Sequence, residues 1–87
     1  MVISKLYITM WCKYWANQYD EYHRLNGPAF EYTAGAKYWF QNDKQHRLDG
    51  PAIEFADGSV QWWYQNEEVD CTTHKEFERY IKLLPFQ

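Results

Sequence analysis

The sequence has few of the residues on which several classes of small protein depend. Only two cysteines, Cys12 and Cys71, occur in 87 residues, and they lie far apart. No Cys-x-x-Cys pair occurs, and no cysteine–histidine cluster has the spacing of a zinc site. We therefore expect no metal, no cofactor and two free thiols. A Cys12–Cys71 bridge stays open as an alternative if the ends of the fold meet.

Long apolar runs are also lacking. No stretch approaches the roughly 18 apolar residues that a membrane-spanning helix needs. The start of the chain, Met1–Lys5, has no apolar segment behind a basic end, so it does not have the form of a signal peptide. We expect a cytoplasmic protein that is not inserted in a membrane.

An excess of positive charge is the third absence. The chain has 12 acidic residues against 9 lysines and arginines, and its formal net charge is -3. A protein that binds duplex nucleic acid normally carries the opposite balance, so direct binding of duplex is not expected. The acidic excess lies near the C-terminus, at Glu67, Glu68, Asp70, Glu76 and Glu78.

Aromatic residues are abundant. They make up 21% of the chain, with eight tyrosines, five tryptophans and five phenylalanines. Aromatic side chains bury a large area each, so they can hold together a thin fold with a small core. A chain of this length forms one domain, residues 1–87.

A repeat is the most informative pattern in the sequence. Residues His23–Glu31 read HRLNGPAFE and residues His46–Glu54 read HRLDGPAIE, 23 positions later. Self-similarity with a period of 20 to 50 residues is typical of stacked architectures. We divide the chain into an N-terminal hairpin (1–22), repeat 1 (23–45), repeat 2 (46–68), and a C-terminal helix and tail (69–87).

Each repeat predicts a β-hairpin. Segments 28–33 and 51–56 alternate apolar and polar residues, and a glycine, Gly35 or Gly58, follows each of them. A second strand follows each glycine, at 37–41 and 60–65. With two strands from the N-terminal stretch, we predict a mainly β fold: a single curved antiparallel meander of about six strands.

The turns set the expected register. Asp57-Gly58 suits a two-residue type I′ turn, which would pair Ile53 with Trp62 and leave Trp63 on the opposite face. For the first hairpin to match, Gly35 must lie in a three-residue turn in a left-handed conformation. The expected buried face then consists of Phe30, Tyr32, Tyr38, Phe40, Ile53, Phe55, Trp62 and Tyr64, with Trp39 and Trp63 opposite.

The C-terminal segment predicts one α-helix, at about 73–84. Thr73 and Glu76 have the spacing of a capping box. Apolar residues follow at the spacing of one helix face, and Pro85 ends the pattern. We expect this helix to cover an otherwise exposed edge of the sheet.

The strand-Gly-x-x-x-Trp pattern resembles MORN-type repeats, and the HRL[ND]GPA heptad resembles the HRLDGPA-repeat proteins encoded by tailed bacteriophages. The resemblance covers most of 17–87, whereas residues 1–16 match only through Lys13-Tyr14-Trp15. It implies a hairpin-repeat fold, a phage source and action in the host cytoplasm. Many phage proteins of this size inhibit host proteins, including CRISPR effectors. The chain departs from the family at Asn42-Asp43 and Asn66-Glu67, where Asn-Gly is common, so these turns are expected to differ.

The candidate binding residues fall into three groups, and the first two have an alternative, structural reading. Trp15, Trp39 and Trp63 recur every 24 residues and would form an exposed ladder, or else pack in a second core. The pairs His23-Arg24 and His46-Arg47 would grip an acidic surface, or else close their own turns by hydrogen bonding to the backbone and to Asn26 or Asp49. The acids Glu67, Glu68 and Asp70 would meet a basic groove or mimic the charge of nucleic acid.

No residue set predicts catalysis. Cys71 and His74 are close in sequence, but no orienting group accompanies them and the nearby acids disfavour a thiolate. Glu31 and Glu54 are expected to be cross-strand charge partners of nearby cations, and the isolated glycines form no phosphate loop. We expect a protein that is not an enzyme.

The leading interpretation is a small binding protein that inhibits a host protein, such as a component of a defence system or a nucleic-acid-binding protein, by occluding its surface. Anti-CRISPR-type counter-defence is its specific form, and this rests on the resemblance and the size. Two alternatives stay open. One is a single-stranded nucleic-acid-binding module that uses the aromatic face, with Lys13 and Lys37 beside the arginines. The other is an assembly component that forms a homodimer through exposed sheet edges.

Overall fold

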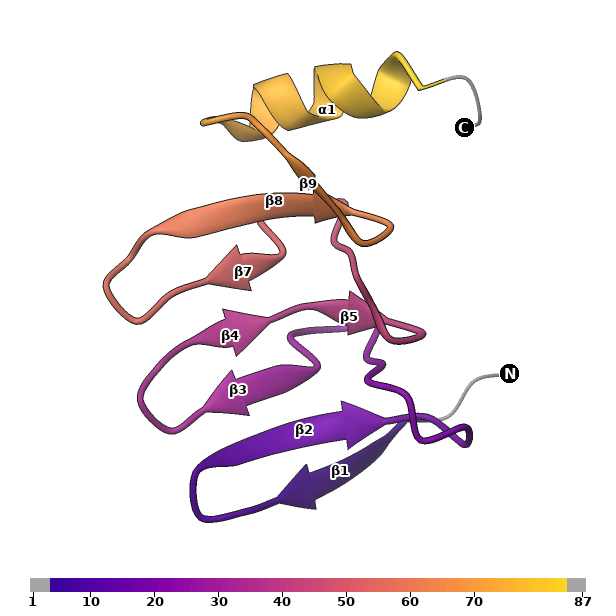
Figure 1. Cartoon of the computed structure of the whole chain (residues 1–87), viewed down its shortest axis with the longest axis vertical. Helices are drawn as coiled ribbons and strands as arrows, with labels where there is room; N and C mark the ends of the chain where they lie inside the picture. The colour runs from indigo at the N-terminus through magenta and orange to yellow at the C-terminus, as the bar shows by residue number, and fades with distance from the viewer. Residues whose placement is uncertain (1–3, 85–87) are drawn as a thin grey trace.

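The computed structural model describes residues 4–84, and these form an antiparallel meander with one helix (Figure 1). Seven strands pair in the order β1-β2-β3-β4-β7-β8-β9. The molecule is thin, with extents of 39 × 34 × 17 Å. The strands are Lys5–Ile8 (β1), Cys12–Ala16 (β2), Phe30–Tyr32 (β3), Lys37–Tyr38 (β4), Ile53–Glu54 (β7), Val60–Tyr64 (β8) and Glu67–Val69 (β9).

A second, two-stranded sheet interrupts the meander between β4 and β7. It consists of β5 (Phe40–Gln41) and β6 (Lys44–Gln45), joined by Asn42-Asp43. Both turn residues have positive φ, 51° and 67°. Gln65-Asn66 joins β8 to β9 in the same way, with φ of 47° and 70°. The structure thus has the mainly β meander and the helix that the sequence predicts, and it adds strands that the sequence analysis assigned to polar connections.

The register of the second hairpin differs from the prediction. The Phe55 N–H donates to the Ser59 carbonyl over 2.9 Å, so the loop that contains Gly58 has three residues instead of two. Ile53 therefore pairs with Gln61, and not with Trp62. The loop at Gly35 has the same length, and its glycine has φ of 117°, as predicted.

The equal loops make corresponding positions of the two repeats 23 residues apart. Trp39 and Trp62 both lie beside Ala52 in the register, so Trp62, and not Trp63, occupies the position of Trp39 in the second repeat. Trp63 lies on the opposite face of the sheet, because neighbouring residues of a strand alternate. Trp15 precedes Trp39 by 24 positions because the loop after β2 is one residue longer than the loop of the next hairpin.

The two faces of the sheet have different chemistry. On one face, which we call the aromatic face, eight rings contact one another: Tyr7, Tyr14, Tyr22, Phe30, Tyr32, Tyr38, Phe40 and Phe55. The other, which we call the charged face, carries Lys13, Glu31, Lys37 and Glu54 in cross-strand register, with Arg24, Arg47, Trp15 and Trp39.

The predicted aromatic stripe is thus largely confirmed as one face, but it is less buried than expected. Ile53 is buried, Phe30 and Tyr38 are half-buried, and Tyr32 is exposed. Trp62 and Tyr64 are two residues apart in β8, so both lie on the charged-face side, where Tyr64 packs against the cluster that contains the buried Trp62. The predicted places of Trp62 and Tyr64 in the stripe are therefore wrong.

Helix α1 (His74–Lys82) covers the last strands of the sheet (Figure 1). It begins at the predicted capping box, in which Thr73 and Glu76 bond each other's backbone. Its Phe77 is fully buried and packs with Trp62 and Val69, which together form the buried cluster at this end.

Three further observations concern the described residues. Cys12 and Cys71 are both free thiols. No group of three or more metal-ligating side chains occurs between Ser4 and Leu84. The helix found in this range has nine residues, which is too short to cross a membrane.

Candidate functional site

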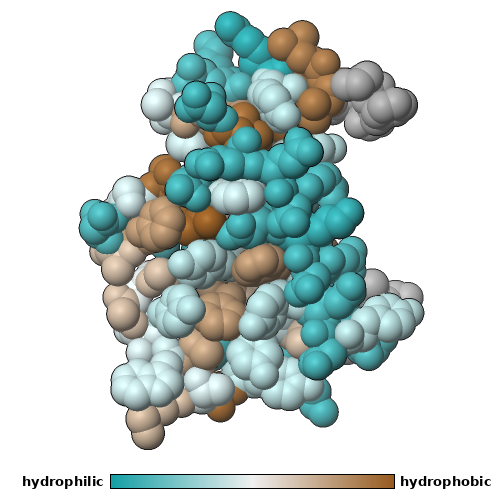
Figure 2. All heavy atoms as spheres, viewed as in Figure 1, coloured by the Kyte–Doolittle hydropathy of each residue, from teal (hydrophilic) through white to brown (hydrophobic). Residues whose placement is uncertain are grey.

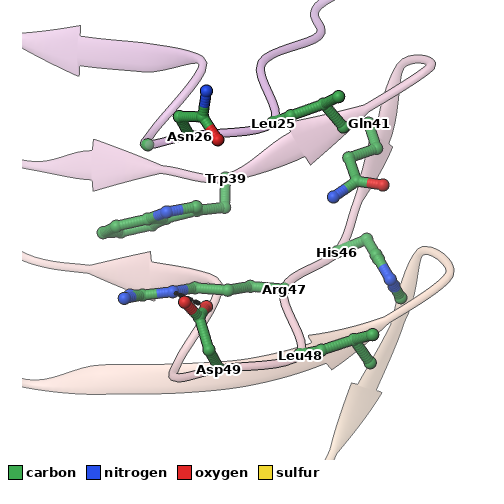
Figure 3. A pocket seen from close by; sticks show the side chains of 9 residues that line it. Leu25, Asn26, Trp39, Gln41, His46, Arg47, Leu48 and Asp49 are labelled. Atoms are coloured by element: carbon green, nitrogen blue, oxygen red, sulfur yellow. Dashed lines mark hydrogen bonds and ion pairs between the residues drawn. The ribbon is translucent and has the colours of Figure 1, made fainter.

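The arginine of each repeat lies on the tryptophan of the preceding unit. The Arg24 guanidinium is 3.7 Å from the centre of the Trp15 ring, and that of Arg47 is 4.0 Å from the centre of the Trp39 ring. Figure 3 shows the Trp39 ring and the extended Arg47 side chain lying side by side, although they come from different segments. These cation–π stacks join consecutive units of the meander.

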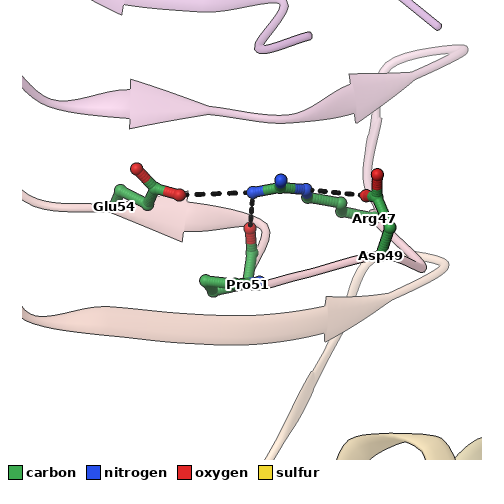
Figure 4. Close-up of polar contacts among 4 residues, drawn as sticks. All are labelled: Arg47, Asp49, Pro51 and Glu54. Carbon is green, nitrogen blue, oxygen red and sulfur yellow. Dashed lines mark hydrogen bonds and ion pairs between the residues drawn. The ribbon is translucent and has the colours of Figure 1, made fainter. Parts of the chain in front are cut away.

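Hydrogen bonds hold the Arg47 guanidinium in place within its own repeat (Figure 4). Its Nη1 donates to the Pro51 carbonyl over 3.1 Å and to Glu54 over 3.2 Å, and its Nε donates to Asp49 over 2.9 Å. The bond from Arg47 is the main reason that the pKa of Asp49 lies below its ordinary value. Arg24 repeats the contact with the proline carbonyl and lies 3.6 Å from Glu31.

The glycine of each motif leaves room for this arginine. A Cβ on Gly50 would lie 2.8 Å from Cζ of Arg47, and a Cβ on Gly27 would lie 2.9 Å from Cζ of Arg24. Real Cβ atoms do not approach other atoms so closely, so any larger residue would displace the guanidinium. The alanine that follows is fully buried in both copies, at Ala29 and Ala52.

The histidines connect each repeat to the next turn along the chain. Nδ1 of His23 accepts the Asn42 N–H over 2.9 Å, and Nδ1 of His46 accepts the Gln65 N–H over 3.1 Å. Both rings are buried. Burial also lowers the pKa of His46 from its ordinary value of 6.5, because the charged form would lose its hydration.

The HRL[ND]GPA motif therefore has a structural explanation. Its arginines and histidines form internal contacts, which is the alternative reading of the sequence, and Asp49 bonds Arg47 as that reading expects. No corresponding bond from Arg24 to Asn26 is present. The leucines, Leu25 and Leu48, point away from these contacts and are exposed.

A hollow of about 380 Å³ lies on the charged face between the two repeats (Figure 3). Its walls include Trp39, Arg47 and Asp49, with Leu25 and Leu48 at its sides. The cation of this hollow is already bonded to two carboxylates. An anionic ligand would have to compete with both of them, so the hollow is a poor anion site.

The other predicted contact residues are dispersed. Trp15 and Trp39 lie under arginines on the charged face, whereas Trp63 lies on the opposite face and donates to Gln61 over 3.1 Å. The expected ladder of three therefore does not form on one face. The acidic side chains Glu67, Glu68 and Asp70 are exposed on β9 and directly after it.

The aromatic face is the surface that the alternation of apolar and polar residues predicts to be buried. It has a hollow of about 280 Å³, lined by Tyr22, Phe30, Tyr32, Tyr38 and Phe40. In Figure 2, pale and brown residues, many of them rings, gather over the strands of the lower and middle part of the sheet. Among the residues that line this hollow, only Tyr22 lies outside the segments predicted as strands, so the alternation pattern does not identify it.

A second exposed apolar surface lies at the β1 edge. Ile8 is 74% exposed, Met10 79% and Trp11 70%. The sequence predicts a strand in this stretch but indicates no role for it. The run of apolar residues between Leu6 and Trp11, before the first recognisable repeat, was the available signal.

Cys71 does not have the properties of a nucleophile. Burial raises the pKa of its thiol, and the nearby Glu76 and Asp70 raise it further. A thiol of raised pKa is protonated at neutral pH and reacts slowly.

Comparison of the chain with known protein families, curated proteins and solved structures found no match in any of the three. The resemblance to HRLDGPA-repeat proteins stays a prediction from the motif.

Proposed function

We propose that this chain is a small binding protein, not an enzyme, which occupies a surface of another protein with its aromatic face. The observation that carries this proposal is the separation of chemistry between the two faces. The central strands place Lys13, Glu31, Lys37 and Glu54 on the charged face, and leave half-exposed rings on the other.

Tyrosine-rich surfaces are typical of binding sites. Tyrosine brings a large apolar area and a polar hydroxyl, and its two side-chain angles lose little entropy on binding. Tyr7 is 40% exposed and Tyr32 is 44% exposed, and a shallow hollow lies between the rings. A protruding apolar side chain of a partner would fill this hollow.

The resemblance gives the proposal its specific form. In that form the chain is encoded by a phage, works in the cytoplasm of the host cell and inhibits a host protein, such as a component of a defence system. The exposed acids Glu67, Glu68 and Asp70 would then face a basic part of the target.

The nucleic-acid alternative is less well supported by the geometry. A single-strand reader needs cations beside its stacking rings. Here Lys13 and Lys37 lie on the face opposite the aromatic rings, and Arg24 and Arg47 are paired with Glu31 and Glu54. The open rings of the aromatic face and these cations would therefore contact different surfaces, and the tryptophans beside the cations, Trp15 and Trp39, are covered by the arginines.

A pull-down from host lysate, with and without nuclease, tests the proposal. We expect a stoichiometric protein partner that survives nuclease and is identified by mass spectrometry. The variant Tyr32→Lys should lose it, because the new charge lies among the rings, whereas the control Tyr19→Lys, at a loop position that is 72% exposed, should keep it.

Two outcomes would contradict the proposal. Retention that disappears with nuclease and falls steeply with salt would favour the single-strand reader. A nuclease-resistant partner that Tyr32→Lys still binds would show that the aromatic face is not the contact surface.

A further inference from the structure

Strand β1 forms an edge of the sheet with apolar residues. All four of its residues are exposed: Lys5, Leu6, Tyr7 and Ile8. Monomeric proteins usually protect such an edge with charges, prolines or a covering element, because an open edge invites pairing with another chain. Here the edge has one charge, Lys5, and no proline.

The backbone of β1 leaves hydrogen-bonding groups at this edge. Leu6 pairs with Trp15 in the register, and Trp15 directs its own N–H to Ala29 in the next segment. In an antiparallel pair, the residue opposite then directs its N–H and carbonyl away from the partner strand. Leu6, and Ile8 two positions later, therefore present these groups to the outside.

A helix covers the C-terminal end of the meander, whereas the β1 end is open in the part of the chain that the structure describes. At the C-terminal end, α1 places Phe77 against Trp62, where an arginine covers the equivalent Trp39. The helix thus serves as the cap that repeat proteins need. At the other end, no strand between Ser4 and Leu84 pairs with the outer side of β1.

We propose that the β1 edge is the interface of a homodimer, in which two copies pair β1 with β1 in antiparallel fashion. A twofold axis perpendicular to the sheet would pass through the Tyr7 position. Leu6 of one copy would lie opposite Ile8 of the second copy and exchange both backbone hydrogen bonds with it. The two Tyr7 side chains would meet at the axis.

Geometry selects this register. A residue of β1 whose backbone N–H and carbonyl point outward must lie opposite a residue of the same kind in the second copy. Leu6 and Ile8 of one copy can therefore pair only with Leu6 or Ile8 of the second copy. Pairing them with each other uses the outward groups of both residues within β1. It also places Lys5 opposite Thr9 of the second copy, which avoids a clash of like charges at the interface.

Side chains of the edge suit a second copy on both faces. Leu6 and Ile8 share the charged-face side and would form two apolar cross-strand pairs. On the other side, Tyr7 stacks on Tyr14 with ring centres 5.1 Å apart, and the row would continue into the Tyr7 ring of the second copy. The twofold axis keeps the same face upward in both copies, so the aromatic face would double.

Size-exclusion chromatography with light scattering on the purified full chain tests this proposal. We expect twice the mass of one chain at high concentration. Ile8→Asp should give the monomer mass, since it places charges beside Leu6 of the second copy. Leu83→Asp is the matched control at a similarly exposed site, 78% against 74%, and should stay dimeric. Circular dichroism checks that both variants fold.

A crosslink tests the register separately. In a background of Cys12→Ser and Cys71→Ser, Tyr7→Cys should form an intermolecular disulfide under mild oxidation, because a non-hydrogen-bonded pair brings the Cα atoms to about 4.5 Å. Tyr19→Cys in the same background should not.

The results that would overturn the proposal are clear. They are a monomer at every concentration, a dimer that Ile8→Asp leaves intact, or a Tyr7→Cys crosslink no faster than that of Tyr19→Cys. These measurements need no partner protein, so they stand or fall independently of the proposed function.

Discussion

The guanidinium of Arg47 lies 4.0 Å from the centre of the Trp39 ring, which belongs to the preceding repeat. The same contact joins Arg24 to Trp15 at 3.7 Å. Few large side chains are fully buried in this thin molecule, and among the described residues Phe77 is the large side chain that is. Stability must therefore come largely from contacts between neighbouring units, as in other repeat proteins.

Replacing Arg47 tests that idea. Arg47→Ala removes the stack on Trp39 and the bonds to Pro51 and Glu54, so we expect a loss of about 2 kcal/mol in the free energy of unfolding. Arg47→Lys should lose about half of that, because it keeps the charge but not the planar fork. Urea denaturation measures both. Lys75→Ala, at an exposed helix position, is the control, and an equal effect of Arg47→Ala and Lys75→Ala would contradict the interpretation.

A substitution at Gly50 tests the packing around the same arginine, Arg47. Its added Cβ would meet Arg47 Cζ at 2.8 Å, so we expect Gly50→Ala to destabilise the fold by about 1–3 kcal/mol. In the Arg47→Ala background the clash is absent, and most of this loss should disappear. Gly58→Ala is the control: its Cβ meets nothing within 4 Å, but its φ is 91°, so its loss should be the same in both backgrounds. Additive losses for Gly50 would refute the steric explanation.

The local patterns predicted most of the fold. Alternation and glycine placed the hairpins, and the capping box at Thr73 placed the helix. The predicted register of the second hairpin was wrong because Trp62 and Trp63 are adjacent in the sequence, and either of them can be aligned with Trp39. Loop length decides between them, and Asp57-Gly58 fits a two-residue turn by composition although the chain uses three residues.

The roles of the repeated histidines could not be predicted. His23 and Asn42 are 19 residues apart, as are His46 and Gln65, and their bonds depend on how consecutive hairpins stack. The motif indicated that the histidines belong to a structural unit, but not which backbone group they contact. The exposure of the aromatic face was missed for a related reason, because alternation cannot tell a covered face from an open one.

The buried His46 predicts a pH dependence of stability. Burial lowers the pKa of the folded imidazole below its ordinary value of 6.5, so the unfolded chain binds this proton first as the pH falls. The contribution of neutral His46 is complete above pH 6.5 and is lost progressively as the pH falls below that value. Urea denaturation at several pH values above 5, where carboxylates stay ionised, should show this loss.

His46→Gln isolates that contribution. Glutamine keeps an acceptor for the Gln65 N–H but does not titrate. The variant should therefore have a smaller slope of unfolding free energy against pH between pH 5 and 7 than the native chain. An unchanged slope would show that other groups cause the dependence.

Phe77 tests whether α1 acts as a cap. Its side chain is fully buried against Trp62 and Val69, so Phe77→Ala should cost about 3–5 kcal/mol, a large part of the stability of a small domain. Glu78→Ala, on the same helix but exposed, should change little. Trp62 is 7% exposed, and loss of the cap would admit water to its ring and shift the tryptophan fluorescence to the red before the sheet unfolds. A single unfolding transition of helix and sheet in Phe77→Ala would show that the cap is part of the cooperative unit. A stability of Phe77→Ala equal to that of Glu78→Ala would contradict the prediction, because the helix would then be an appendage and the sheet would be stable without it.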